Sequence, residues 1–382
     1  MVPAAHLLDL LADRGVVDVT GVPCSYLTPL INRAASGSRA RYLPVTHEGE
    51  AVALAAGAWL AGAGACVIAQ NSGLGNMVNP LTSLTHAARI PTPVVLTWRG
   101  EPGRPDEPQH ELMGRTMHDL MDVIEVGHTL LPGEPDAMAG AVALGWKEME
   151  TSELPHAFVL RQGILDDEPL HEPPPATPAR PDVVRHEPLR TPPARITALE
   201  ELLSVLPDCA AIVCTTGKSS RELFTLADRP QHFYLVGAMG SASTVGLGAA
   251  RHTDRPMVVI DGDGAALMRL GAFAAVARHG TGRLLHILLD NGVHDSTGGQ
   301  RTLAPQVDFP AIAAACGYRT VHDCPDLPSF TTALRSALDA AHGPTLIRLT
   351  IAPGSLERLG RPTVKPAEVA RRFRDFVTGG TR

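Results

Sequence analysis

The sequence has no surplus of basic residues. It contains 33 Lys and Arg residues and 40 Asp and Glu residues, which gives a formal net charge of -7 at pH 7. Proteins that bind nucleic acid usually present a basic face, so this balance argues against nucleic acid as the main partner. An anionic small molecule is still possible as a ligand, because screening over about 8 Å at physiological salt lets the charges around a pocket dominate.

Several common motifs are also missing. The six cysteines form no C-x-x-C pair, so the sequence has neither a zinc ribbon nor a thioredoxin-like site. Scattered cysteines fit a reducing compartment. The dinucleotide fingerprint and the P-loop are absent, as are a signal peptide and a run of about 20 apolar residues. We therefore expect a cytoplasmic protein with no membrane partner.

A proline-rich window divides the chain of 382 residues. Residues 169–194 contain proline too often for a helix or an inner strand, because proline lacks an N–H group and fixes φ. The window therefore predicts an extended linker. Domains of about 100–200 residues are typical, so we expect two of them, at residues 1–168 and 195–382.

On either side of the linker, strand-like apolar runs alternate with helical segments. Strands are predicted at Val16–Val19, Tyr42–Val45, Ala65–Ala69, Pro93–Trp98, Ala157–Leu160, Ala210–Cys214, Met257–Ile260, Leu284–Leu289 and Thr345–Leu349. Helices are predicted at Ala4–Arg14, Glu48–Ala61, Asn76–Ala88, Arg195–Val205, Ala265–Arg278 and Pro328–Ala341. This alternation predicts an α/β fold with two doubly wound parallel sheets, each covered by helices on both faces.

Two turns in the second half contain candidate ligands of a metal–diphosphate site. Asp261-Gly262-Asp263-Gly264 follows one predicted strand, and Asp290-Asn291-Gly292 follows the next. The carboxyl ends of parallel strands open on the same edge of a sheet. The Asp263 carboxylate, the Asn291 amide oxygen, a main-chain carbonyl near Val293 and diphosphate oxygens could complete an octahedral magnesium site. Gly262 and Gly264 would let the anion approach the backbone.

A simple turn and an EF-hand loop are the competing interpretations of this motif. An isolated G-D-G is more often a simple turn, and only the strand placement together with Asn291 favours a metal site. An EF-hand loop fails, because Ala265 stands where a third oxygen ligand is required.

The G-D-G motif followed by Asn-Gly resembles the signature of thiamine-diphosphate enzymes. Further segments strengthen the resemblance: the stretch from Thr46 to Ala51, Gly237-Ala238-Met239-Gly240, Gln70–Asn76, Trp98–Gly103, Asp106–His110 and Thr216–Leu223. Together they are similar to the phosphonopyruvate decarboxylases and the related sulfopyruvate decarboxylases. One position departs from the pattern, since many relatives have Asn where this chain has Asp290. Asp290 could raise metal affinity or merely orient the loop, and the sequence leaves both open.

The resemblance implies a pyrimidine-binding domain at residues 1–168 and a diphosphate-binding domain at 195–382. It also implies a homo-oligomer, at least a dimer, with thiamine diphosphate and Mg²⁺ bound between subunits. The activity it implies is decarboxylation of 3-phosphonopyruvate to phosphonoacetaldehyde and CO₂, in phosphonate and antibiotic biosynthesis. Sulfopyruvate decarboxylation, carboligation and a non-catalytic binding module on the same cofactor site remain as alternatives.

The resemblance also assigns site residues. Glu48 takes the place of the glutamate that activates the cofactor, and Met239 that of the apolar residue which bends it. Cofactor contacts are expected at Glu48, Ser72, Asn76, Gly237, Met239, Gly262, Asp263, Gly264 and Asn291. Substrate contacts are expected at Ser25, Arg99, His110, Lys218 and Arg221, since Arg suits bidentate anion binding. Catalytic roles are expected for Glu48, His110 and His294, because histidine titrates near neutrality.

Overall fold

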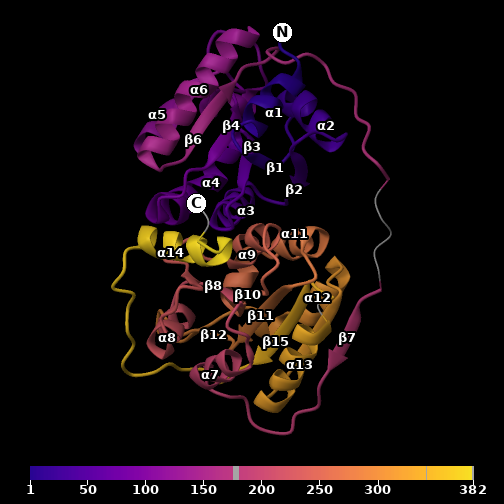
Figure 1. Cartoon of the computed structure of the whole chain (residues 1–382), viewed down its shortest axis with the longest axis vertical. Coiled ribbons are helices and arrows are strands. Elements are labelled where there is room, and N and C mark those ends of the chain that lie inside the picture. Colours follow the sequence, from indigo (N-terminus) through magenta and orange to yellow (C-terminus); the bar gives the residue numbers. More distant parts are fainter. Residues whose placement is uncertain (175–179, 341, 381–382) are drawn as a thin grey trace. The chain divides into compact units, whose positions relative to one another are not determined.

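The computed structural model describes residues 1–174, 180–340 and 342–380. They fold into two compact units, formed largely by the residues before position 175 and by those after position 179. Both units have the α/β architecture that the sequence predicts (Figure 1). None of the described helices is long and apolar enough to cross a membrane.

The N-terminal unit is built on a parallel sheet of six strands in the order β2-β1-β3-β4-β6-β5. The strands are β1 (Val16–Gly21), β2 (Arg41–Pro44), β3 (Gly64–Gln70), β4 (Pro93–Thr97), β5 (Gly127–Leu130) and β6 (His156–Leu160). The α-helices are α1 (Ala4–Ala12), α2 (Thr28–Ala35), α3 (Glu48–Leu60), α4 (Leu74–Pro80), α5 (Glu111–Val123) and α6 (Pro135–Ser152). Short helical turns are η1 (Ser25–Leu27), η2 (Asn71–Gly73), η3 (Leu81–His86) and η4 (Pro108–His110).

The C-terminal unit is built on a parallel sheet of seven strands in the order β7-β14-β15-β11-β10-β8-β9. Its strands are β7 (Asp182–Arg185), β8 (Ala211–Cys214), β9 (His232–Tyr234), β10 (Met257–Gly262), β11 (Leu284–Asp290), β14 (Thr320–Cys324) and β15 (Thr345–Thr350). A small antiparallel pair is formed by β12 (Val293–His294) and β13 (Gln300–Arg301). The helices are α7 (Arg195–Val205), α8 (Lys218–Leu226), α9 (Ala242–Ala250), α10 (Asp263–Met268), α11 (Ala272–His279), η5 (Ala304–Gln306), α12 (Phe309–Cys316), α13 (Leu327–Ala340) and α14 (Pro366–Thr378).

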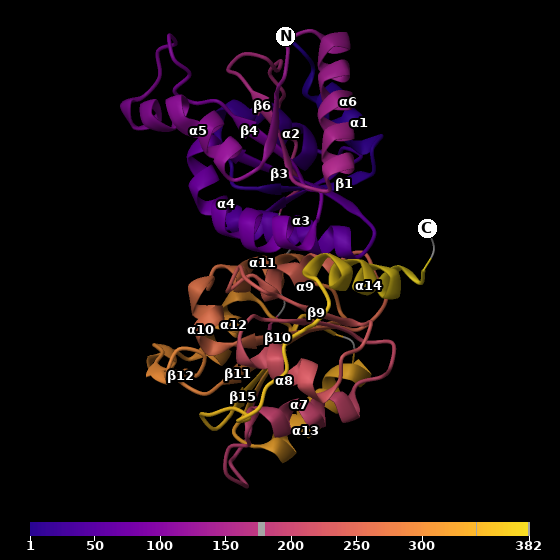
Figure 2. The ribbon, with the colours of Figure 1, turned by 90° about the vertical axis from the view of Figure 1, so that its left-hand side faces the viewer.

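Helices cover both faces of the C-terminal sheet, which explains its continuous apolar strands. Figure 2 shows α9, α11 and α12 on one side and α7, α8 and α13 on the other. All seven residues of β11 are buried, including the polar His286 and Asp290. Strands buried on both faces read as unbroken apolar runs instead of alternating ones. This is why the predicted strands of this unit lie close to the observed ones.

The structure corrects two local predictions. The helix predicted at Ala265–Arg278 is two helices, α10 and α11, because Arg269 leaves the helical backbone with φ -136° and ψ 51°. The window predicted as an extended linker contains β7, which pairs with β14 at the edge of the C-terminal sheet. Edge strands need fewer apolar residues than inner ones, so β7 gave little signal in the sequence. The last residue of the helix predicted at Pro328–Ala341 lies outside the described residues.

Asp326 joins the segment after β7 to the start of α13. Its buried carboxylate accepts hydrogen bonds from the main-chain N–H groups of Leu189 (2.7 Å) and Arg190 (2.8 Å). Ser329 donates two more, from its N–H at 3.1 Å and its hydroxyl at 2.7 Å. Burial alone would raise the pKa of Asp326, but these hydrogen bonds outweigh it and lower the pKa to about 2.

We predict that Asp326→Ala lowers the free energy of unfolding of the C-terminal unit by about 2–3 kcal/mol at pH 7, because hydrogen bonds to a charged group are lost. The carboxylate has a lower pKa in the folded state, so its contribution is complete above pH 4 and is lost as the pH falls towards 2. Urea unfolding should therefore show a difference between wild type and variant that shrinks below pH 4. A difference that stays constant down to pH 2 would contradict this role of the carboxylate.

Candidate active site

A cavity lies at the carboxyl edge of the C-terminal sheet. The chain leaves β8 for β9 on one side and then crosses to β10 on the other, and ligands of open α/β sheets bind at such reversals. The turns after β8, β10 and β11 all contribute to its wall. The lining residues are Arg195, Thr215–Ser219, Met239, Gly262–Ala265, Leu289, Asn291 and Val293–Thr297.

Asp263 is a buried carboxylate in this cavity. One of its oxygens accepts a hydrogen bond of 2.5 Å from the Thr302 hydroxyl. Burial raises the pKa of Asp263, because the charged form is poorly solvated there. No Lys or Arg among the described residues forms an ion pair with it. A buried negative charge is costly without a cation, so this position suits a metal ion.

Asn291 shares the cavity with Asp263. Its Nδ2 donates a hydrogen bond of 2.7 Å to Asp295, and its Oδ1 accepts one of 3.2 Å from the Val293 N–H. Gly292 has φ +69°, a left-handed conformation that favours glycine, and lets the chain turn into β12. Asp263, Asn291 and Val293 thus line one cavity, and carboxylate, amide and main-chain oxygens are the kinds of ligand that magnesium prefers.

Asp290 serves the fold of this loop. Its carboxylate accepts hydrogen bonds from Arg348 Nε (2.9 Å) and Nη2 (2.7 Å), and it is buried. Arg348 also donates to Asp323 at 2.8 Å. Asp290 is absent from the cavity lining. Of the two roles left open by the sequence, the geometry favours orientation of the loop.

The cavity also presents features that fit a diphosphate. The Thr215 hydroxyl is buried and has no hydrogen-bond partner among the described residues, so it can donate to a ligand. Lys218 lines the cavity at the first turn of α8, where free N–H groups favour an anion. A Cβ on Gly264 would lie 2.6 Å from the His294 ring, so only glycine allows this ring to pack there.

Among the other predicted residues of this unit, Met239 and His294 line the cavity, whereas Gly237 and Arg221 are not among its lining residues. The Arg221 guanidinium donates hydrogen bonds of 3.1 Å to the carbonyls of Leu359 and Gly360. The structure therefore does not bring Arg221 to the cavity, because the segment before α14 binds its Nε and Nη2 groups.

Glu48 lies at the corresponding edge of the N-terminal sheet, after β2. Its Oε2 accepts a hydrogen bond of 2.8 Å from Asn76 Nδ2. Its carboxyl group also packs over Gly73, where an added Cβ would lie 2.5 Å from Oε1. Glu50 is different: it is buried and accepts hydrogen bonds from the N–H (3.2 Å) and hydroxyl (2.9 Å) of Thr46. Glu48 is thus the half-buried glutamate of this pair, and Glu50 stabilises the start of α3.

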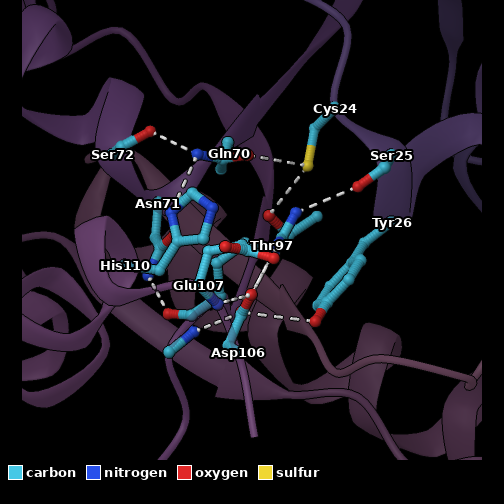
Figure 3. Close-up of polar contacts among 12 residues, drawn as sticks. Cys24, Ser25, Tyr26, Gln70, Asn71, Ser72, Thr97, Asp106, Glu107 and His110 are labelled. Carbon is cyan, nitrogen blue, oxygen red and sulfur yellow. Dashed lines mark hydrogen bonds and ion pairs between the residues drawn. The ribbon is translucent and has the colours of Figure 1, made fainter.

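A polar cluster lies at the ends of β1, β3 and β4, where this sheet also reverses its strand order. Figure 3 shows Gln70 between Ser72, Cys24 and His110. Gln70 Nε2 donates to the Ser72 hydroxyl at 2.6 Å and lies 3.5 Å from His110 Nδ1. Its Oε1 accepts from the Cys24 thiol at 3.3 Å. The structure therefore brings Ser72 and His110 together, although they are far apart in the sequence.

Arg99 is paired with Asp106 in the same cluster. Its Nε donates to Asp106 Oδ2 at 2.8 Å, its Nη2 to Oδ1 at 2.5 Å and its Nη1 to the Ser25 hydroxyl at 3.0 Å. Its guanidinium lies 4.3 Å from the centroid of the Tyr26 ring. The Arg99 side chain holds the pKa of Asp106 well below its usual range. Arg99 is therefore already paired with a carboxylate, so only part of its guanidinium is available for the substrate contact that the sequence predicted.

Four polar residues of these clusters were not predicted as site residues: Asp106, Arg195, Asp295 and Thr302. Each contacts a predicted site residue or another member of this group through its side chain. The partners of Arg195 and Thr302 lie 100 and 39 positions away, beyond the reach of local patterns. The partners of Asp106 and Asp295 lie only 7 and 4 positions away, but these contacts depend on loop conformations that the sequence did not predict.

Two family descriptions match the chain. "Thiamine pyrophosphate enzyme, N-terminal TPP binding domain" covers residues 1–123, and "Thiamine pyrophosphate enzyme, C-terminal TPP binding domain" covers residues 215–349. Among solved structures, the thiamine diphosphate-dependent 4-hydroxybenzoylformate decarboxylase of Rhodococcus jostii has a TM-score of 0.71 at 15% identity. That similarity covers 93% of this chain and 100% of the other, and it shows the shared fold.

Curated relatives are more similar in sequence. The phosphonopyruvate decarboxylase of Streptomyces hygroscopicus is 60% identical over 380 residues, which covers 99% of this chain and 94% of that protein. The sulfopyruvate decarboxylase of Methanosarcina acetivorans is 27% identical over 385 residues, with coverage of 98% and 97%. The chain belongs to the thiamine pyrophosphate enzymes, and within them to the group that contains the phosphonopyruvate decarboxylases.

We predict that Gly73→Ala displaces the Glu48 carboxyl group without unfolding the protein, because the clashing atoms are the flexible end of a side chain. Displacing a reacting group by about 1 Å can cost about 100-fold in rate, and we expect a loss of that size in thiamine-diphosphate-dependent turnover. Gly75→Ala is the matched control, since a Cβ at Gly75 has no neighbour within 4 Å. Equal activity of the two variants would contradict the prediction.

Proposed function

We propose that the protein decarboxylates 3-phosphonopyruvate to phosphonoacetaldehyde and CO₂, with thiamine diphosphate and Mg²⁺. The observation that carries this proposal is the 60% identity to a phosphonopyruvate decarboxylase over nearly the whole of both chains. The cavity around Asp263 and Asn291 supports it, because it combines a buried carboxylate without a cationic partner with donors suited to a diphosphate.

In this proposal Asp263, Asn291 and the main-chain carbonyl of Val293 hold the magnesium ion. Thr215 and the first turn of α8 receive the diphosphate, and Ser72, Asn76, Gly237 and Met239 contact the rest of the cofactor. Thiamine diphosphate, when bound, supplies the carbanion and the electron sink that decarboxylation of a 2-oxo acid requires.

Glu48 is the proposed proton-exchanging residue. Asn76 engages its Oε2, so Oε1, which lies over Gly73, is the oxygen that remains to hold a proton. A fixed donor on one oxygen keeps the carboxyl group in one orientation, which general acid–base catalysis requires.

The substrate carries two anionic groups that need hydrogen-bond donors. Arg99 uses its Nε and one N–H on each of its two terminal nitrogens on Asp106 and Ser25, so two of the five guanidinium N–H groups remain. We propose that these N–H groups, Ser25, Lys218 and His110 bind the substrate, and that His110 and His294 deliver protons. Arg221 is the weakest of the predicted contacts, because it is not among the residues that line the cavity and main-chain carbonyls bind its Nε and Nη2 groups.

We further propose a cytoplasmic homo-oligomer, at least a dimer, in which the pyrimidine-binding domain (residues 1–168) and the diphosphate-binding domain (residues 195–382) of different subunits share each cofactor. The reaction would serve phosphonate and antibiotic biosynthesis. Sulfopyruvate remains the second candidate substrate, because a sulfopyruvate decarboxylase is 27% identical over nearly the full length.

We predict that purified protein releases CO₂ and free phosphonoacetaldehyde from 3-phosphonopyruvate, with a higher kcat/KM than on sulfopyruvate. Removal of thiamine diphosphate and magnesium should abolish turnover, and Glu48→Ala should lower kcat by at least about 100-fold, the scale of lost acid–base catalysis. Steady-state assays of both acids, with product identification, provide the measurement.

Each alternative has its own result. A higher kcat/KM on sulfopyruvate would reassign the substrate, and an acyloin product would indicate a carboligase. Turnover that survives removal of both cofactors, or a Glu48→Ala variant with native kcat, would contradict the proposed mechanism.

A further inference from the structure

The amide of Asn291 needs a fixed orientation before it can serve a metal ion. Its oxygen and nitrogen are similar in shape but opposite in function, so neighbouring donors and acceptors decide which one faces the cavity. Asp295 Oδ2 lies 2.7 Å from Asn291 Nδ2, and a carboxylate can only accept. The Val293 N–H lies 3.2 Å from Oδ1 and can only donate. Both contacts select the same orientation.

Asp295 is itself held in place. The Arg195 Nη2 group donates to Asp295 Oδ2, and the Gly354 N–H donates to Oδ1 at 3.1 Å. The side chain of Arg195 is only 6% exposed, and its Nη1 group also donates to the Gly354 carbonyl (3.2 Å) and lies 3.5 Å from Glu222. The Asp295 carboxylate thus has partners on both oxygens, and these come from three separate segments of the chain.

We propose that Asp295, fixed by Arg195, is a positioning residue that orients Asn291 for magnesium binding. The inference rests on the proposed function, because it requires Asn291 to be a metal ligand. Residues that orient a metal ligand typically change metal affinity by about 10–100-fold when they are removed. Arg195 pairs with Asp295, so the effect is one of orientation rather than of added negative charge.

The experiment is a magnesium titration of the full-length protein at a saturating concentration of thiamine diphosphate. Calorimetry and the midpoint temperature of thermal unfolding are the two readouts of magnesium binding. For Asp295→Ala we expect the half-saturating magnesium concentration to rise about 10–100-fold. For Asp295→Asn, which keeps one acceptor, we expect an intermediate rise. At saturating magnesium, kcat should return to within about twofold of wild type, because the ligand itself is intact.

Asp228→Ala is the matched control. Asp228 accepts hydrogen bonds from Arg372 at 2.9 and 2.6 Å in the same unit, and it is absent from the cavity lining. This variant also loses an Asp–Arg pair, so a general loss of stability would appear in it as well, while its magnesium requirement should stay at the wild-type value.

If the half-saturating magnesium concentration of Asp295→Ala is within twofold of the wild-type value, the positioning role of Asp295 is overturned, whereas the proposed function is unaffected. If Asp295→Ala does not fold, an unchanged requirement in Asp295→Asn would do the same. If the wild-type protein binds no magnesium together with thiamine diphosphate, the proposed function fails, and this inference fails with it.

Discussion

The carboxylate of Asp263 is almost completely buried and has no cationic side chain beside it among the described residues. Burial of such a negative charge is unfavourable unless a cation is bound next to it. Arg195 and Lys218 also line this cavity, but Arg195 is paired with Asp295, and neither side chain forms an ion pair with Asp263 among the described residues. The proposed metal site at Asp263, Asn291 and Val293 would supply the missing positive charge.

Parallel strand topology explains why the functional residues converge in both units. In each sheet the strand order reverses next to a central strand, and the loops after the neighbouring strands meet at one edge. In the C-terminal unit this edge gathers the turns that carry Asp263 and Asn291. In the N-terminal unit it gathers Gln70, Arg99 and the loop that ends at His110. The fold places these residues without any need for them to be neighbours in sequence.

The sequence predicted the elements with strong local signals and missed contacts that depend on distant partners. Continuous apolar runs located β10 and β11, and the two aspartate-containing turns after them do line one cavity, as predicted. The break between α10 and α11 and the edge strand β7 had no comparable signal. The segments that contain Arg99 and Asp106 were both recognised in the sequence, but the pairing of the two side chains was not predicted. Sequence alone does not show which carboxylate an arginine contacts. This ion pair leaves only part of the Arg99 guanidinium available to a ligand.

If Asp263 supplies a charge that only a metal–diphosphate ligand completes, stabilisation by that ligand must depend on this carboxylate. Thermal unfolding of wild type and Asp263→Asn, each with thiamine diphosphate alone, magnesium alone and both together, tests this dependence most directly. We predict that only the combination stabilises the wild type, by about 5–10 °C at 100-fold excess over Kd, and that Asp263→Asn shows no such rise. An equal rise in the variant, or none in the wild type, would contradict the assignment of Asp263 to the metal site.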